Sequence, residues 1–255
     1  MSAASVSSVE FIRLQENGGP LVSFERAWIL QKQMVEEVSD GRRPSTIFFV
    51  EHPPVVTRGR GLQWTGLARD RARPIASLPS GTDYFEIERG GDLTWHGPGQ
   101  FVVYPILDLK NEAFPFARDV GKYVRFLERW ISTVLRHYQI ESHALENAAG
   151  VWLGSGTQAR KIASLGIAIK KWVSYHGLAL NVSPELTGFK GFDPCGFESS
   201  VMTSIERETK STPALEKLES QFEQAFRHLV SFSGATDEPS SVQRVEVSEL
   251  ISSRI

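Results

Sequence analysis

The chain has 255 residues, of which 41% are hydrophobic and 23% charged, as in an ordinary soluble protein of one large or two small domains. Lys and Arg number 28 and Asp and Glu 30, a formal net charge of −2, which argues against a general nucleic-acid-binding protein because such proteins carry a basic excess. The single cysteine, Cys195, excludes an intramolecular disulfide and a metal site built from cysteines, and it favours a reducing compartment. The apolar runs are too short to span a bilayer, and the N-terminus has no signal-peptide layout. We therefore expect a cytoplasmic protein with neither membrane nor nucleic-acid partners.

Apolar spacing in the first half of the chain predicts both helices and strands. Hydrophobic residues recur at helical spacing over residues 24–38, and Asp40-Gly41 supplies a stop signal. Residues 45–50, 84–88 and 101–107 read as short strands, the first of them halted by His52-Pro53-Pro54. A long amphipathic helix follows over residues 116–138.

The second half contains a predicted hairpin and a further helix. Residues 161–169 alternate as a strand, with Lys161, Ala163 and Leu165 on one face, and residues 173–182 return after a turn at Lys170-Lys171-Trp172. Thr212-Pro213 begins a helix that extends to about residue 229. Mixed elements with hairpin-linked strands favour an α+β fold with mixed or antiparallel sheets flanked by helices. We expect one catalytic domain over residues 9–231, with tails at 1–8 and 232–255.

The segment 89–100, RGGDLTWHGPGQ, carries four glycines and one proline between two predicted strands. Glycine there allows the backbone to approach a ligand closely, although a tight surface loop would use the same residues. The spacing matches neither a Walker loop nor a dinucleotide fingerprint, so a nucleotide site is not indicated.

Two further segments offer reactive side chains. Lys161 heads the apolar face of its strand, and desolvation lowers the pKa of an amine, although the ammonium of a strand-end lysine can also reach water. His176 lies on the returning arm, where a histidine is more often a core residue than a catalytic one. Cys195 stands between Pro194 and Gly196, and this turn setting favours an accessible thiol, although lone cysteines are commonly buried.

Taken together, these segments resemble the octanoyltransferase family, also called the lipoate–protein ligase B family. The matching motifs are R-G-G-x-x-T-x-H-G-P-G-Q at 89–100, K-I-A-x-x-G at 161–166, H-G-x-A-x-N at 176–181 and P-C-G at 194–196. The E-H-P-P-V segment at 51–55 and the Y-P-I-L-D-L segment at 104–109 also match. The similarity covers about residues 20–230 in the family's order.

The resemblance implies a fold similar to the biotin and lipoate protein ligase catalytic domains, with a larger and a smaller sheet. It implies transfer of an octanoyl group from octanoyl-acyl carrier protein to a lysine of a lipoyl domain, without metal or other cofactor. The acceptors would be the lipoyl domains of 2-oxoacid dehydrogenases and the glycine-cleavage H protein. By the same resemblance, Cys195 forms an acyl thioester and Lys161 acts as acid and base. The implied substrate-binding residues are Arg89, Gly90, Gly91, Asp92, Leu93, Thr94, Trp95, His96, Ser164, Leu165, Gly166, Gly177, Leu178 and Ala179.

Three other functions remain open at this stage: an ATP-dependent lipoate ligase, a non-catalytic acyl- or carrier-protein-binding module, and a thioesterase. For His96 and His176 we expect positioning roles rather than proton transfer. Because carrier proteins are acidic, Arg58, Arg60, Lys170 and Lys171 are candidates for a local basic docking patch. We expect a monomer.

Overall fold

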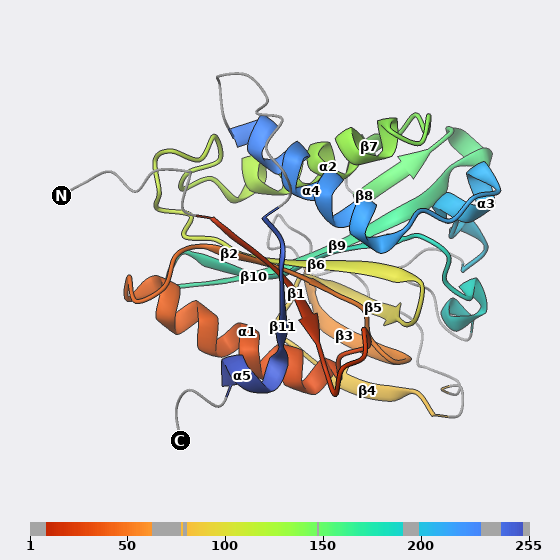
Figure 1. Ribbon diagram of the computed structural model, residues 1–255. Helices are drawn as coiled ribbons and strands as arrows, with labels where there is room; N and C mark the ends of the chain where they lie inside the picture. The colour runs from red at the N-terminus through yellow and green to blue at the C-terminus, as the bar shows by residue number, and fades with distance from the viewer. Residues whose placement is uncertain are drawn as a thin grey trace.

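Two β-sheets of unequal size organise the chain (Figure 1). The computed structural model describes residues 9–62, 78, 81–146, 148–190, 199–230 and 241–251. Within these residues, the larger sheet has eight strands in the order β11-β1-β2-β6-β10-β9-β8-β7. Their bounds are β1 Glu10–Gln15, β2 Thr46–Val50, β6 Gln100–Ile106, β7 His143–Leu145, β8 Ala148–Leu153, β9 Arg160–Lys170, β10 Val173–Asn181 and β11 Gln243–Glu246.

The smaller sheet has the order β4-β3-β5 and consists of β3 Val55–Leu62, β4 Asp83–Glu86 and β5 Gly91–His96. Strand β1 pairs in parallel with both β2 and β11, and β3 pairs in parallel with β4. The remaining strand pairs are antiparallel. This combination of mixed sheets and helices confirms the predicted α+β class.

Helices cover both faces of the larger sheet (Figure 1). On one face, α2 Val120–Arg136 and α4 Leu215–Val230 enclose a core that includes Trp130 and Phe222. On the other face, α1 Phe24–Ser39 and α5 Val247–Ile251 pack over a second core. The short helices are α3 Ile205–Thr209 and the 3₁₀ turns η2 Gly156–Gln158, η3 Leu186–Phe189 and η5 Ser199–Val201. None of the helices described is both long and apolar enough to cross a membrane.

Local sequence explains the bounds of α1. The Ser23 hydroxyl accepts a hydrogen bond from the Arg26 N–H and so satisfies one of the free donors at the helix start. Ala27, Leu30 and Met34 form the buried stripe. The helix ends before Asp40, and Gly41 takes a positive φ of 70° that glycine adopts without strain. The predicted helix over 24–38 is therefore confirmed.

Two predictions about irregular segments are wrong. Half of the glycine-rich segment is the strand β5, whose residues Gly91–His96 pair with β3. The expected C-terminal tail contains β11 and α5, because Val247 and Leu250 are buried against α1 and β11 extends the sheet beside β1. The expected tail at residues 1–8 lies outside the described residues.

Candidate active site

A narrow cavity lies between the larger and the smaller sheet, and several sequence motifs meet there. It is lined by Phe24, Ile87, Arg89, Thr94, His96, Val102, Tyr104, Ser164, Leu165, Gly166, His176, Gly177, Leu178 and Ala179. The volume of this cavity is about 30 Å³. We call this the acyl cavity, after the chain that the resemblance predicts its lining residues to bind.

Many of the residues expected to bind substrate do line the acyl cavity. They are Arg89, Thr94, His96, Ser164, Leu165, Gly166, Gly177, Leu178 and Ala179. They come from three separated motifs, which the pairing of β9 with β10 and the position of β5 bring together.

The other expected residues lie near the cavity without lining it. Because strand side chains alternate, Thr94 and His96 face the cavity, whereas Leu93 and Trp95 pack on the opposite side in a separate core. Asp92 forms an ion pair with Arg58 at 3.3 Å. The remaining two are backbone positions: the Gly90 N–H donates to the Ile167 carbonyl, and Gly91 begins β5.

Sequence reasoning missed four lining residues, namely Phe24, Ile87, Val102 and Tyr104. The alternation of β6 places Val102 and Tyr104 on one face, but the pattern does not say which face meets the smaller sheet. Phe24 and Ile87 reach the cavity from the start of α1 and the end of the 84–88 segment, and no local pattern distinguishes them from core residues.

Arg89 explains why glycine is needed at position 166. The guanidinium group donates to the Thr57 carbonyl at 2.7 Å and to the Thr57 hydroxyl at 2.8 Å, and the residue is only 5% exposed. A Cβ atom added to Gly166 would lie 2.8 Å from Arg89 Cδ. The arginine stem therefore crosses β9 where a side chain is absent, which joins the R-G-G and K-I-A-x-x-G motifs.

Two histidines beside the cavity are neutral at pH 7. Burial lowers the pKa of His52 to about 4 and that of His96 to about 3. The His52 Nδ1 donates to the Val22 carbonyl at 2.6 Å, which leaves Nε2 to accept from the Tyr104 hydroxyl at 2.8 Å. Such fixed neutral rings favour positioning over charge stabilisation.

A chain of hydrogen bonds connects His96 with Lys161. His96 Nδ1 donates to Gln100 Oε1 at 2.7 Å, and Gln100 Nε2 donates to Asn181 Oδ1 at 2.9 Å. Asn181 Nδ2 donates to the Thr203 carbonyl at 2.9 Å, and the Thr203 N–H donates to the Lys161 carbonyl at 3.0 Å. Gln100 and Asn181, the last residues of two motifs, are therefore connected through Thr203 to the backbone of Lys161.

Lys161 is 2% exposed and lies at the start of β9. Across β8 and β9, Val151 pairs with Ala163 but Trp152 pairs with Lys161, so Ile162 is an extra residue that forms a bulge. Paired residues share a face, and Val151 and Ala163 both pack into the core under α2 and α4. Lys161 therefore points to the opposite face, and the prediction that it shares a face with Ala163 and Leu165 is wrong.

The side chain of Lys161 lies against aromatic and backbone groups. Its Nζ is 5.3 Å from the centroid of the Trp152 ring, within the range of a cation–π contact. A Cβ on Gly150 would lie 2.6 Å from Lys161 Cε and 3.2 Å from Nζ. Behind Gly150, the backbone N–H donates to Glu128 Oε1 at 3.3 Å, and burial raises the pKa of that carboxyl. Gly150 therefore lies next to both the lysine and a buried acid.

Cys195 lies outside the described residues, and so do Pro194 and Gly196. Met202, seven residues after Cys195, forms a parallel bridge with Lys161. The chain that follows the P-C-G motif therefore returns to the predicted catalytic lysine.

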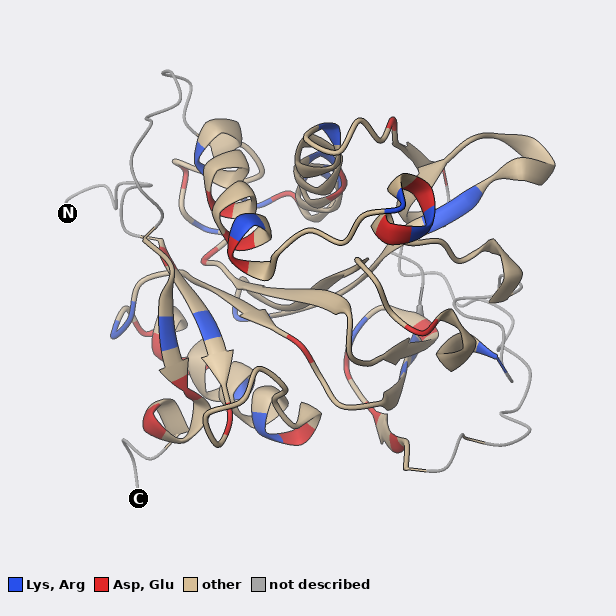
Figure 2. Ribbon diagram, turned by 45° about the vertical axis from the view of Figure 1, so that its right-hand side comes forward, with Lys and Arg blue, Asp and Glu red and all other residues tan. Residues whose placement is uncertain are grey.

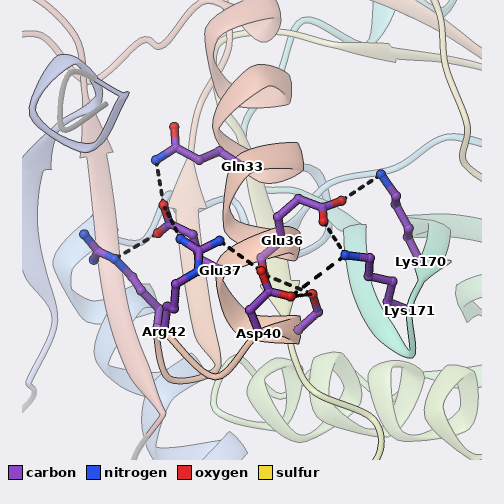
Figure 3. A network of polar contacts seen from close by, with 9 residues as sticks. Gln33, Glu36, Glu37, Asp40, Arg42, Lys170 and Lys171 are labelled. Atoms are coloured by element: carbon purple, nitrogen blue, oxygen red, sulfur yellow. Dashed lines mark hydrogen bonds and ion pairs between the residues drawn. The ribbon is translucent and has the colours of Figure 1, made fainter. Parts of the chain in front are cut away.

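The hairpin lysines are engaged with α1. Lys170 and Lys171 contact the two Glu36 carboxylate oxygens at 2.8 and 2.6 Å, and Lys171 lies 3.9 Å from Asp40 (Figure 3). Hydrogen bonds from Lys170 and then Lys171 lower the pKa of Glu36 to about 2. The pair therefore does not form the uncompensated basic patch that the sequence suggested.

Charges of both signs alternate over the helices and outer strands (Figure 2). The central strands β6 and β10 contain no Lys, Arg, Asp or Glu. Of the other two patch candidates, Arg58 is paired with Asp92, and Arg60 lines a second cavity described below.

Comparison with known proteins gives a consistent assignment. Residues 23–227 match the family described as "Lipoyl protein ligase A/B catalytic domain". The octanoyltransferase of Cytophaga hutchinsonii is 36% identical over 214 residues, covering 77% of this chain and 84% of the relative. The octanoyltransferase of Flavobacterium psychrophilum is 39% identical over 209 residues, covering 77% of this chain and 86% of the relative.

Solved structures with the same fold are more distant in sequence. A bipartite lipoate protein ligase from Thermoplasma acidophilum superposes with a TM-score of 0.62 at 12% identity, covering 94% of this chain and 90% of the other. A lipoate-protein ligase A bound with ATP gives a TM-score of 0.60 at 11% identity, covering 94% and 92%. At these identities the structures confirm the fold, while the curated relatives supply the activity class. The chain therefore belongs to the lipoyl protein ligase A/B catalytic domain family and is an acyltransferase of the octanoyltransferase type.

Proposed function

We propose that this enzyme moves an octanoyl group from octanoyl-acyl carrier protein to the ε-amine of a lysine on a lipoyl domain. The covalent intermediate is a thioester on Cys195, and Lys161 carries protons in both half-reactions. The observation that best supports this proposal is the burial of Lys161 on the strand and face that lead into the acyl cavity. Burial of a lysine removes a charged group from water and costs free energy, which a catalytic role would explain.

The geometry around Lys161 suits a positioned proton carrier. Its backbone is held by Thr203, its side chain is packed between Trp152 and Gly150, and Ser164 follows three residues later at the cavity. Three residues of strand span about 10 Å, so the lysine lies at one end of the cavity. An acyl carbonyl near Lys161 would leave the hydrocarbon tail to extend along β9 toward Gly166.

The reaction has two balanced steps. In the first, Lys161 takes the Cys195 proton, the thiolate sulfur attacks the carrier thioester, and the carrier sulfur leaves with that proton. In the second, the acceptor amine attacks the Cys195 thioester, a C–N bond replaces the C–S bond, and Lys161 moves the amine proton to the departing thiolate. The substrate and the product of the first step are both thioesters, so this step needs no ATP.

The competing activity on the same fold is ATP-dependent ligation, since one related structure is a ligase bound with ATP. The two activities differ in what they require. Product formation from octanoyl-acyl carrier protein in the absence of ATP supports the transferase. A requirement for ATP with free octanoate would support the ligase.

The covalent step is tested by the intact mass of the protein after incubation with octanoyl-acyl carrier protein. We expect one octanoyl group, removable by hydroxylamine. Cys195→Ser should fold, fail to form this adduct and lose transfer, because serine is a far weaker nucleophile at neutral pH. Unchanged turnover in folded Cys195→Ser would refute the thioester mechanism.

The proton-carrying role is tested by Lys161→Arg beside Lys161→Ala. Arginine keeps a positive charge but does not lose a proton in proteins. We expect both variants to lose multiple-turnover transfer, and arginine to rescue acylation of Cys195 more than transfer to the lipoyl domain. Full multiple-turnover activity in Lys161→Arg would show that charge alone suffices.

A further inference from the structure

A second cavity lies beyond the acyl cavity and is much larger. Its volume is about 370 Å³, against about 30 Å³ for the acyl cavity. Residues of α1 and the end of β9 form part of its wall, among them Val35, Ala168 and Ile169. We call it the outer cavity.

Two segments form the partition that separates the two cavities, and in each of them neighbouring residues line different cavities. Between β4 and β5, Ile87 and Arg89 line the acyl cavity, while Glu88 between them lines the outer cavity. On β10, His176 lines the acyl cavity and its neighbour Tyr175 lines the outer one. Each segment therefore presents consecutive side chains to opposite cavities.

The side chains of this partition meet at His176 and Glu88. His176 Nε2 lies 3.6 Å from Glu88 Oε2, and within the described part of the chain this nitrogen is buried without a hydrogen bond. The Trp28 indole N–H donates to the same carboxylate oxygen at 3.0 Å. From the other side, Gln31 Oε1 accepts from the His176 N–H at 2.7 Å. Two residues of α1 therefore hold the partition in place.

The order of residues along β9 gives the acyl cavity a direction. Lys161 comes first, Ser164 and Gly166 line the acyl cavity, and Ala168 lines the outer cavity. If the reacting carbonyl lies at Lys161, as the proposed function requires, the far end of the hydrocarbon chain points toward His176 and Glu88.

We propose that the His176–Glu88 contact is the end wall of the acyl site and sets the maximum length of the transferred chain. A longer chain would have to displace two held side chains. It would also have to bring methylene groups against a carboxylate, which is costly to remove from water. Removal of the wall would instead open a route into the 370 Å³ of the outer cavity.

The test compares octanoyl, decanoyl and dodecanoyl groups on the same carrier protein. Wild type should prefer octanoyl. In Glu88→Ala the dodecanoyl-to-octanoyl ratio of kcat/KM should rise at least tenfold, since each buried methylene is worth about fourfold in binding. Glu86→Ala is the matched control, because Glu86 lies two residues away on β4 and lines neither cavity. A ratio within twofold of wild type in folded Glu88→Ala would overturn the proposal.

A second variant covers the case in which Glu88→Ala does not fold. His176 has a φ of 55°, which glycine adopts without strain, so His176→Gly thins the wall from the other side. We expect the same shift toward longer chains, and an unchanged ratio in this variant also counts against the wall.

Two measurements separate the wall from the catalytic proposal. Binding of free octanoate and dodecanoate by calorimetry needs no transfer, and Glu88→Ala should bind dodecanoate more tightly relative to octanoate than wild type does. In wild type, an octanoyl thioester with a photoreactive terminal carbon should label residues 87–89 or 176. Labelling confined to other segments would contradict the proposal that the His176–Glu88 contact ends the acyl site, even if octanoyl transfer is normal. Absence of any octanoyl transfer by wild type would instead refute the proposed function.

Discussion

Replacement of Gly150 by alanine should disable the enzyme while leaving the predicted catalytic residues intact. The added Cβ would lie 2.5 Å from the Ala163 carbonyl oxygen, 2.6 Å from Lys161 Cε and 3.2 Å from Lys161 Nζ. Real Cβ atoms do not approach so closely, so the lysine, the backbone or both must shift. Movement of β8 is opposed by the hydrogen bond from the Gly150 N–H to Glu128.

The expected loss of stability has two parts. Gly150 has a φ of 135°, and a non-glycine residue held in a sparsely populated backbone region costs about 1–3 kcal/mol. Overpacking of a filled site costs about another 1–3 kcal/mol. We therefore expect the free energy of unfolding to fall by about 2–6 kcal/mol, a large share of the roughly 5–15 kcal/mol of a typical domain.

The matched control is Gly156→Ala, in the turn between β8 and β9. Gly156 also has a positive φ, 58°, but among the described residues no heavy atom beyond its chain neighbours lies within 4 Å of an added Cβ. This variant should lose only about 1–2 kcal/mol, the backbone cost of a left-handed residue. It should keep full activity.

Urea unfolding gives the stability of both variants, and octanoyl transfer is then measured at a temperature where each is fully folded. Gly150→Ala should lose transfer at least a hundredfold, because misplacement of a catalytic group by about 1 Å can cost that much. Transfer within threefold of wild type in folded Gly150→Ala would refute the argument that this glycine positions Lys161.

Two further perturbations address pH and charge. Burial lowers the pKa of His52 to about 4, so between pH 6.5 and 4 the unfolded chain binds a proton that the folded chain does not. As the pH falls through this window, the free energy of unfolding decreases by up to about 1.4 kcal/mol per pH unit. His52→Gln should flatten the pH dependence of urea unfolding in that window, and an unchanged slope would contradict this assignment. Glu36→Gln would release Lys170 and Lys171 from their shared carboxylate, so the KM for the acidic carrier-bound donor should fall at low salt but not at high salt. An equal effect on octanoyl-pantetheine would show that the lysines do not act through docking.

The regular elements with strong periodicity were predictable from sequence. The helix over residues 24–38 has a capping serine, a buried stripe and a glycine stop. The predicted strands over 161–169 and 173–182 correspond to β9 Arg160–Lys170 and β10 Val173–Asn181. These signals are local, because they depend only on the spacing of side chains along one element. The sequence motifs also contain many of the residues that line the acyl cavity.

The remaining features depend on contacts between distant segments. The strand Gly91–His96 was hidden by its glycines, and β11 by its polar composition, since each forms only because a partner strand is already in place. The bulge at Ile162 reverses the face of Lys161, and strict alternation has no means of signalling one inserted residue. The contact between Glu88 and His176 joins segments almost ninety positions apart, and each residue alone looks like an ordinary polar side chain.

The pairing of β11 with β1 constrains how the molecule is made. Ile12 pairs with Gln243, so the outermost strand of the larger sheet is supplied by residues synthesised more than two hundred positions after the strand it protects. Until then β1 has one unpaired edge, and such edges recruit strands from other chains. Long-range pairing of this kind is also slow to form. The nascent chain therefore passes through a stage in which most of its sheet can form but one edge remains open to aggregation or to chaperones.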